Sequence, residues 1–179
     1  MKKFEVKQRD MLECRERRVQ IQNAYLEKYH YPVLSFCMNI PGPVKTNESI
    51  RKAFEAGKQE LMARLIEKKF LICAQTEIHE KTGDELILSI SCPAAELKKE
   101  AVRIEETLSF GRLFDMDVID ETGKKLSRSS RRSCIVCGKP VWECARSRAH
   151  SIEELQDAVD RLLQTSNHTC QKSLPGSHG

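Results

Sequence analysis

The sequence predicts an α+β fold in which a mixed or antiparallel sheet is flanked by helices. Helical periodicity in some segments, strand-forming runs in others, and the absence of strict alternation between the two predict this class. The chain has 179 residues, of which 40% are hydrophobic and 31% are charged, a composition typical of globular proteins. We expect one domain over residues 1–166 and a disordered tail over residues 167–179.

Helices are expected where apolar residues recur every three to four positions between helix-breaking residues. Residues 5–30 contain no Gly or Pro. Thr46 or Asn47 can cap a second helix, and Ser151 with Glu154 forms a capping box for the last one. The four expected helices span residues 5–30, 47–69, 94–107 and 151–164.

Strands are expected where β-branched and aromatic residues gather between turn signals. The sequence P-G-P at residues 41–43 ends the first strand. The sequence K-T-G-D at residues 81–84 predicts a turn between the second and third strands, which would make an antiparallel hairpin. The five expected strands span residues 31–40, 69–79, 85–92, 108–119 and 125–129.

The sequence G-R-L-F-D-M-D-V at residues 111–118 is the first candidate for a functional site. Alternate residues of a strand face opposite sides, so Asp115 and Asp117 project together while the apolar residues beside them face a core. Neighbouring carboxylates repel unless a cation shares them, and Mg²⁺ prefers oxygen ligands that it can bridge to phosphates. The alternative is a solvated strand edge with two surface aspartates.

Basic residues flank this acidic pair. Arg112 lies just before it, and several arginines crowd the segment after it, namely Arg128, Arg131, Arg132, Arg146 and Arg148. Carboxylates that hold a metal and arginines that bind phosphate oxygens are the usual division of labour in phosphoryl transfer. The net charge of +4 is mild, and it permits an anionic substrate or an acidic partner.

The loop N-I-P-G-P-V-K-T-N at residues 39–47 joins an expected strand to a helix start. Helix N-termini bind anions through free amides and the helix dipole. Gly42 would allow a close backbone approach, and Lys45 would add a positive charge. The alternative is an ordinary rigid connection, and the P-loop pattern is absent.

Eight cysteines occur in the chain. No apolar segment follows the N-terminus and none could span a bilayer, so we expect a cytoplasmic protein with reduced thiols and no membrane contact. Cys134, Cys137, Cys144 and His150 follow one another as C-x-x-C-x6-C-x5-H, a ligand set that suits structural Zn²⁺. The alternatives are reduced cysteines packed around a buried strand, or a redox C-x-x-C.

Several of these segments together resemble the citrate lyase holo-acyl-carrier-protein synthase family, whose members are apo-citrate lyase phosphoribosyl-dephospho-CoA transferases. The resemblance covers about residues 10 to 165. The matching segments are N-I-P-G-P-V-K at 39–45, T-G-D-E at 82–85, E-E-T-L-S-F-G-R-L-F-D-M-D-V-I-D at 105–120, L-S-R at 126–128, R-x-C-I-V-C at 132–137 and C-A-R-S-R-A-H-S at 144–151. The string at 105–120 is far more specific than any D-x-D pair.

The resemblance implies an activity. A serine of the acyl carrier protein subunit of citrate lyase would attack 2′-(5″-triphosphoribosyl)-3′-dephospho-CoA, forming a phosphodiester and releasing diphosphate. In this chain the implied catalytic residues are Asp115, Asp117 and Arg112, with Mg²⁺ held by the two aspartates. The implied substrate-binding residues are Lys45, Gly42, Arg128, Arg132 and Arg146. Glu106 or Asp120 could complete the metal shell or accept the serine proton.

Other interpretations remain open at this point. The same chemistry could act on another carrier, such as that of malonate decarboxylase. A zinc-stapled module that binds nucleic acid or protein is disfavoured by the 6% aromatic content. Two aspartates on one strand also resemble the nucleotidyltransferase fold, but the Gly-Ser pair that usually precedes its D-x-D is missing here.

Overall fold

The computed structural model describes residues 5–128 and 131–169, with side chains as far as residue 164. The helices in this part of the chain are α1 (Gln8–Tyr29), α2 (Glu48–Glu67), α3 (Ala94–Thr107), α4 (Val141–Ser147) and α5 (Ile152–Thr169), with one 3₁₀ turn, η1 (Gly111–Leu113). The strands are β1 (Val33–Met38), β2 (Leu71–Glu80), β3 (Gly83–Ser91) and β4 (Phe114–Ile119).

The four strands form one sheet in the order β2-β3-β1-β4, and every neighbouring pair is antiparallel. β2 and β3 form the expected hairpin, with Glu80 opposite Gly83. β4 pairs only with β1, so it is an edge strand of this sheet. The predicted α+β class is confirmed, and the sheet is antiparallel.

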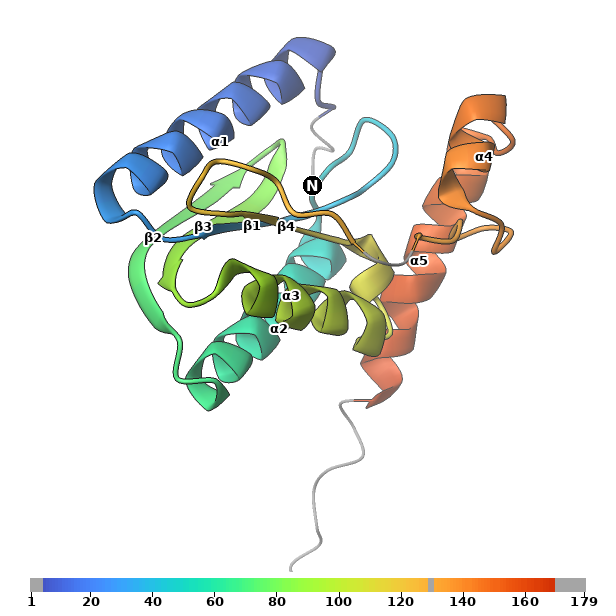
Figure 1. Cartoon of the computed structure of the whole chain (residues 1–179). Helices are drawn as coiled ribbons and strands as arrows, with labels where there is room; N and C mark the ends of the chain where they lie inside the picture. The colour runs from blue at the N-terminus through green and yellow to red at the C-terminus, as the bar shows by residue number, and fades with distance from the viewer. Residues whose placement is uncertain (1–4, 129–130, 170–179) are drawn as a thin grey trace, which may run out of the picture.

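Helices cover both faces of the sheet (Figure 1). α1 lies on one face, where Arg18 donates to Glu85 of β3 and Gln22 donates to Ser35 of β1. α2 and α3 lie on the opposite face, and α5 contacts α2. This layering puts one hydrophobic core between the sheet and the α2–α3 layer.

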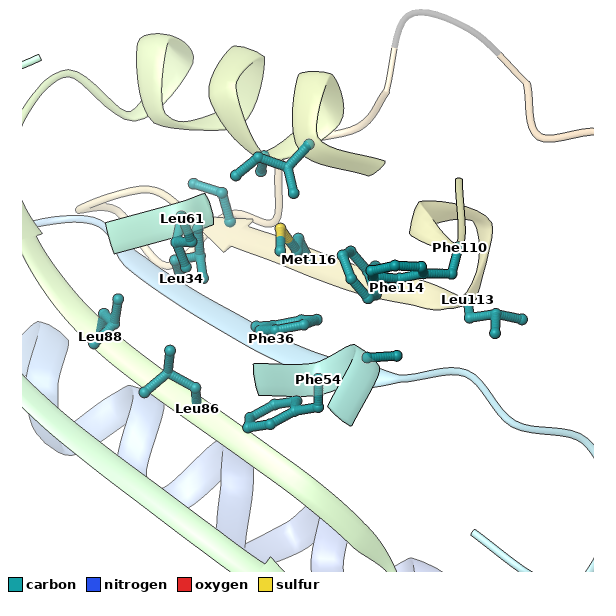
Figure 2. Close-up of a cluster of buried hydrophobic side chains, with 14 of the residues drawn as sticks. Leu34, Phe36, Phe54, Leu61, Leu86, Leu88, Phe110, Leu113, Phe114 and Met116 are labelled. Atoms are coloured by element: carbon teal, nitrogen blue, oxygen red, sulfur yellow. The ribbon is translucent and has the colours of Figure 1, made fainter. Parts of the chain in front are cut away.

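The core is built around aromatic side chains of β1, α2 and β4 (Figure 2). The ring of Phe36 stacks on Phe54 at a centroid distance of 4.8 Å and meets Phe114 edge-on at 4.9 Å. Gly57 lets α2 approach them, because a Cβ there would lie 2.5 Å from the Phe114 ring. Burying one such aromatic side chain contributes roughly 1.5–3 kcal/mol, so β4 is firmly anchored from this side.

Two predicted helix caps are confirmed. The side chain of Asn47 accepts a hydrogen bond from the Ile50 amide at 2.8 Å at the start of α2. At α5, the Ser151 amide donates to Glu154 at 2.8 Å, and the Glu154 amide donates back to the Ser151 hydroxyl at 3.2 Å.

Other expected boundaries were wrong. β4 begins at Phe114 rather than at residue 108, because Gly111 turns tightly against the end of α3. A Cβ at Gly111 would lie 2.6 Å from the Glu105 carbonyl oxygen. In place of a strand at 125–128, only Lys125 forms an isolated bridge, opposite Ile119. Residue 129 of that expected strand lies outside the described residues.

The C-terminal part also differs from expectation. α4 was not predicted, and α5 continues to Thr169 instead of ending at residue 164, so residues 167–169 are helical rather than disordered. The remainder of the expected tail, with Cys170, lies outside the described residues. Within the described ranges, none of the helices combines the length and apolar character needed to cross a membrane.

Candidate active site at the edge of the sheet

The acidic strand divides its side chains as predicted. Along β4, Phe114, Met116 and Val118 are buried, whereas Asp115 and Asp117 are only half-buried on the opposite face. Strand alternation therefore directs both carboxylates away from the core. The apolar residues fix the strand, and the carboxylates are left available for a ligand.

The two aspartates have different neighbours. Asp117 forms an ion pair with Lys125, whose Nζ lies 2.5 Å from Oδ2. The carboxylate of Asp115 makes no hydrogen bond or ion pair within residues 5–128 and 131–169. Its cross-strand neighbour is Cys37, and burial raises the pKa of that thiol to about 12, with the charge of Asp115 acting in the same direction. Cys37 is therefore neutral near pH 7 and does not add a second negative charge beside Asp115.

Glu105 of α3 joins the edge of β4 to two arginines. Its side chain is 2% exposed, and Oε1 accepts a hydrogen bond from the Met116 amide at 2.8 Å. Arg132 donates to the same oxygen at 2.5 Å, and Arg128 donates to Oε2 at 2.8 Å. Because a buried carboxylate is stable only when paired, these contacts hold both arginines beside the strand.

Arg112 lies near the same group. It donates to the Ser133 carbonyl oxygen, and burial, together with the positive charges of Arg132 and Arg128, lowers its pKa. An arginine nevertheless remains charged at neutral pH. The structure thus brings together three of the arginines that the sequence suggested, two of them paired with Glu105.

Lys98 completes this side of the strand. This residue is 8% exposed, and its Nζ donates to the Met116 carbonyl oxygen at 3.0 Å. Burial lowers the pKa of this lysine. A pocket of ≈ 580 Å³, the edge pocket, is lined by Lys98, Asp115, Met116, Asp117, Lys125, Leu126, Ser127, Arg128 and Arg132.

Sequence reasoning missed Lys98 and Glu105, although a signal existed. Both lie on the buried face of α3, among Leu97, Ala101 and Ile104. Charged residues at positions of a helix that face a core need a partner, because burying an unpaired charge is costly. Such positions therefore indicate a buried polar network.

The loop at residues 39–47 is not brought into the edge pocket. Gly42 has a φ of +82°, and a Cβ there would lie 2.5 Å from the Gln156 side chain of α5. Lys45 turns back, and its Nζ donates to the Ile40 carbonyl oxygen at 2.6 Å. Ile40 and other residues of this loop line a different pocket, of ≈ 850 Å³, between the start of α2 and α5.

Three further residues suggested by the sequence do not line the edge pocket. Asp120 accepts hydrogen bonds from the Thr122 and Lys124 amides, both at 2.9 Å, so its carboxylate closes the turn after β4. Arg146 is exposed on α4 and does not line the edge pocket. Glu106 is bound to Arg128 at 2.8 Å.

The cysteine segment, residues 131–150, brings its four predicted ligands together. The sulfur atoms of Cys134, Cys137 and Cys144 and a ring nitrogen of His150 all lie within 4.8 Å of one another, so the group could hold a metal ion. The segment therefore has the donor set of a tetrahedral site.

The thiols of Cys134 and Cys144 differ in how readily they lose a proton. Burial opposes ionisation of Cys134, but hydrogen bonds from the backbone amides of Cys137 and Val136 outweigh it and lower the pKa of this thiol to about 7. Hydrogen bonding to Cys137, together with burial, raises the pKa of Cys144 to about 12. Of these two thiols, Cys134 therefore becomes a thiolate more readily, and the thiolate is the form that binds metals.

The chain is similar to a family of known proteins over most of its length. The family model described as "Apo-citrate lyase phosphoribosyl-dephospho-CoA transferase" matches residues 6–166. A relative from Streptococcus pyogenes serotype M5 (strain Manfredo), named probable apo-citrate lyase phosphoribosyl-dephospho-CoA transferase, is 37% identical over 87% of this chain and 84% of its own. A relative of the same name from Vibrio cholerae serotype O1 (strain M66-2) is 35% identical over 87% and 89%.

The relative from Escherichia coli O139:H28 (strain E24377A / ETEC), named apo-citrate lyase phosphoribosyl-dephospho-CoA transferase, is 32% identical over 86% of both chains. The matched region includes the whole edge pocket and the cysteine segment. The chain therefore belongs to the apo-citrate lyase phosphoribosyl-dephospho-CoA transferase family, a family of transferase enzymes.

Proposed function

We propose that the protein transfers 2′-(5″-triphosphoribosyl)-3′-dephospho-CoA to a serine of the citrate lyase acyl carrier protein. The serine oxygen would bond to the phosphorus next to the ribose, and the bond from that phosphorus to diphosphate would break. The observation that carries the proposal is the edge pocket, where two aspartates lie beside arginines and lysines, and Asp115 has no hydrogen bond or ion pair among the described residues. Family membership supplies the substrate class.

Asp115 and Asp117 would hold Mg²⁺. The donor set fits, because both are half-buried carboxylates on one strand face and Asp115 has no hydrogen bond or ion pair within residues 5–128 and 131–169. When bound, Mg²⁺ would neutralise charge on the reacting phosphate. Lys125 holds Asp117 in place and would lie beside the phosphate chain.

The arginines would bind the phosphate oxygens. Arg128 and Arg132 line the pocket, and Glu105 fixes their orientation. Arg112 does not line it but lies close enough for the charges of these two arginines to act on it. Arginines held in advance stabilise developing charge without having to reorganise during the reaction. Lys98 would add a fourth cation. Lys45 and Gly42 would contact a more distant part of this long substrate.

We propose that the metal of the cysteine segment is Zn²⁺ with a structural role. Three sulfur donors and one imidazole fill four positions, which leaves none open for a catalytic water. Metal analysis of the protein purified without added zinc should give about one zinc per chain. Replacement by Co²⁺ should give thiolate charge-transfer absorption, and a metal content near zero would leave thiol packing as the explanation.

The direct test of the activity is mass spectrometry of the apo acyl carrier protein after incubation with this protein, Mg²⁺ and the triphosphoribosyl precursor. The carrier should gain the mass of the precursor less diphosphate. Asp115→Asn and Asp117→Asn should each lower the rate by roughly a hundredfold or more while circular dichroism shows an intact fold. Full activity of both variants would overturn the assignment, and the malonate decarboxylase carrier in the same assay tests carrier choice.

A further inference from the structure

We propose that the cysteine segment carries the docking surface for the acidic carrier protein, centred on Trp142. This inference rests on the proposed function, because it names where the protein substrate of that reaction would bind. Apart from Arg132, it uses residues of this segment that have no part in the proposed chemistry at the edge pocket.

An apolar patch is exposed at the start of α4. Trp142 is 47% exposed and Val141 is 44% exposed. Together with Arg131 and Arg132 they line a shallow hollow of ≈ 640 Å³. The guanidinium of Arg131 lies over the indole ring, 6.0 Å from its centroid. Exposed aromatic residues next to arginines are typical of the centres of protein interfaces.

The segment that carries this patch is also strongly basic. Residues 131–150 contain five Lys or Arg and one Glu, a net charge of +4 that equals the net charge of the whole chain. Three of these cations are exposed and do not line the hollow, namely Lys139, Arg146 and Arg148. A cationic rim around an apolar centre is complementary to a partner that presents acidic residues around an apolar spot.

The patch is also continuous with the edge pocket. Arg132 lines both the hollow and the edge pocket, where it donates to Glu105 at 2.5 Å. Arg112 reaches the same segment through its hydrogen bond to the Ser133 carbonyl oxygen. A protein bound at Trp142 would therefore lie next to the pocket in which its serine must react.

A nucleobase is a less suitable occupant. Within residues 131–164, Trp142 is the only Phe, Tyr or Trp residue, so this segment offers a base a single large ring on which to stack. A broad protein surface can instead cover the ring and the cationic rim together. The stacked nucleobase is the competing outcome of the test.

Fluorescence tests the proposal directly, because Trp142 is the only tryptophan of the chain. Titration with the apo carrier protein should change its emission in a saturable manner that weakens as salt is added. The same change is expected with Asp115→Asn, which lacks activity but keeps the surface. If the wild-type protein proved to be inactive, the proposed function would be contradicted, but the binding measured by fluorescence would still test the docking surface.

Kinetics provide the second test. Trp142→Ala and the double variant Arg131→Glu, Arg148→Glu should raise KM for the carrier about tenfold or more, with little change in KM for the nucleotide substrate. Matched controls are Ile66→Ala, an exposed apolar residue at the end of α2, and Lys28→Glu on α1; both should leave KM unchanged. An unchanged carrier KM in Trp142→Ala, or a rise in the nucleotide KM instead, would overturn the docking surface.

Discussion

Strand β4 and the cysteine segment both contribute residues to the edge pocket, but they are held in place by different forces. β4 is fixed by the hydrophobic core, where Phe114 and Val118 are fully buried. In the cysteine segment, only Cys134 and Cys144 are buried, and α4 has seven residues. The first region depends on packing, whereas we propose that the second depends on a metal held by its thiols and imidazole.

The difference indicates a division of tasks. Phosphate chemistry needs groups held within a fraction of an ångström, which a strand backed by a core provides. Recognition of a partner needs an exposed surface, which cannot contribute much apolar burial of its own. A metal held by four side chains can order such a surface without a core. Arg132 connects the two regions through Glu105.

The largest expected effect is on the free energy of unfolding, when one aromatic side chain in each region is replaced by alanine. Phe114→Ala should lower the free energy of unfolding by about 3–5 kcal/mol, because it leaves a cavity between Phe36 and Gly57. Trp142→Ala should change it by less than about 0.5 kcal/mol, because its ring is already half in solvent. Urea unfolding followed by circular dichroism measures both, and equal losses would contradict the comparison.

A smaller effect is expected at the connection between the regions. Glu105→Gln should destabilise the protein by about 2 kcal/mol, less than for a fully buried pair because its arginines are partly exposed. The rate should fall further than stability explains, because Arg128 and Arg132 lose their common anchor.

Glu100→Gln is the matched control for this variant. It removes a buried carboxylate from the same helix, one that pairs with Arg64 and Lys68 away from the edge pocket. It should cost similar stability and leave KM for the nucleotide unchanged. If both variants lost activity equally, Glu105 would have no special positioning role.

Loss of the metal ligands should separate the two regions. In Cys137→Ser, or after chelation, the cysteine segment should become sensitive to trypsin while the unfolding free energy of the core changes by less than about 1 kcal/mol. Limited proteolysis with mass spectrometry would locate the cuts. Cys73→Ser, a lone thiol on β2, is the control and should leave the digestion pattern unaltered.

The smallest effect concerns pH. Because burial lowers the folded-state pKa of Lys98, the unfolded chain binds more protons than the folded chain between the two pKa values. Stability due to this group therefore rises with pH in that window. Lys98→Met should lack the rise, so its urea midpoint should gain less than that of the wild type from neutral pH to about pH 10.4, the ordinary value for lysine. Parallel curves would exclude this contribution.

Local patterns in the sequence predicted much of this molecule. The alternation of β4, the caps at Asn47 and Ser151 and the hairpin at residues 81–84 depend on near neighbours, and they are confirmed. The cysteine spacing likewise predicted a cluster that closes in space. α4 was missed because a helix of seven residues has too few turns to display a period.

Contacts between distant segments could not be predicted in the same way. Arg128 and Arg132 were predicted to bind substrate, but their pairing with Glu105, more than 20 residues away in each case, was not predicted. Gly42 was expected to allow close approach of an anion, and the structure places the Gln156 side chain of α5 against it, 2.5 Å from where a Cβ would lie. No local pattern encodes such pairs, because they exist only once α3, α5 and the sheet have packed.

The outer edge of β4 has a consequence for how copies of the protein behave in concentrated solution. The Met116 amide is bound by Glu105, the Met116 carbonyl by Lys98, and the Val118 carbonyl by the Leu126 amide. An edge strand with free backbone groups invites the edge of another molecule and starts aggregation. Here two side chains and one backbone amide already bind these groups, so a neighbouring copy cannot use them to extend the sheet.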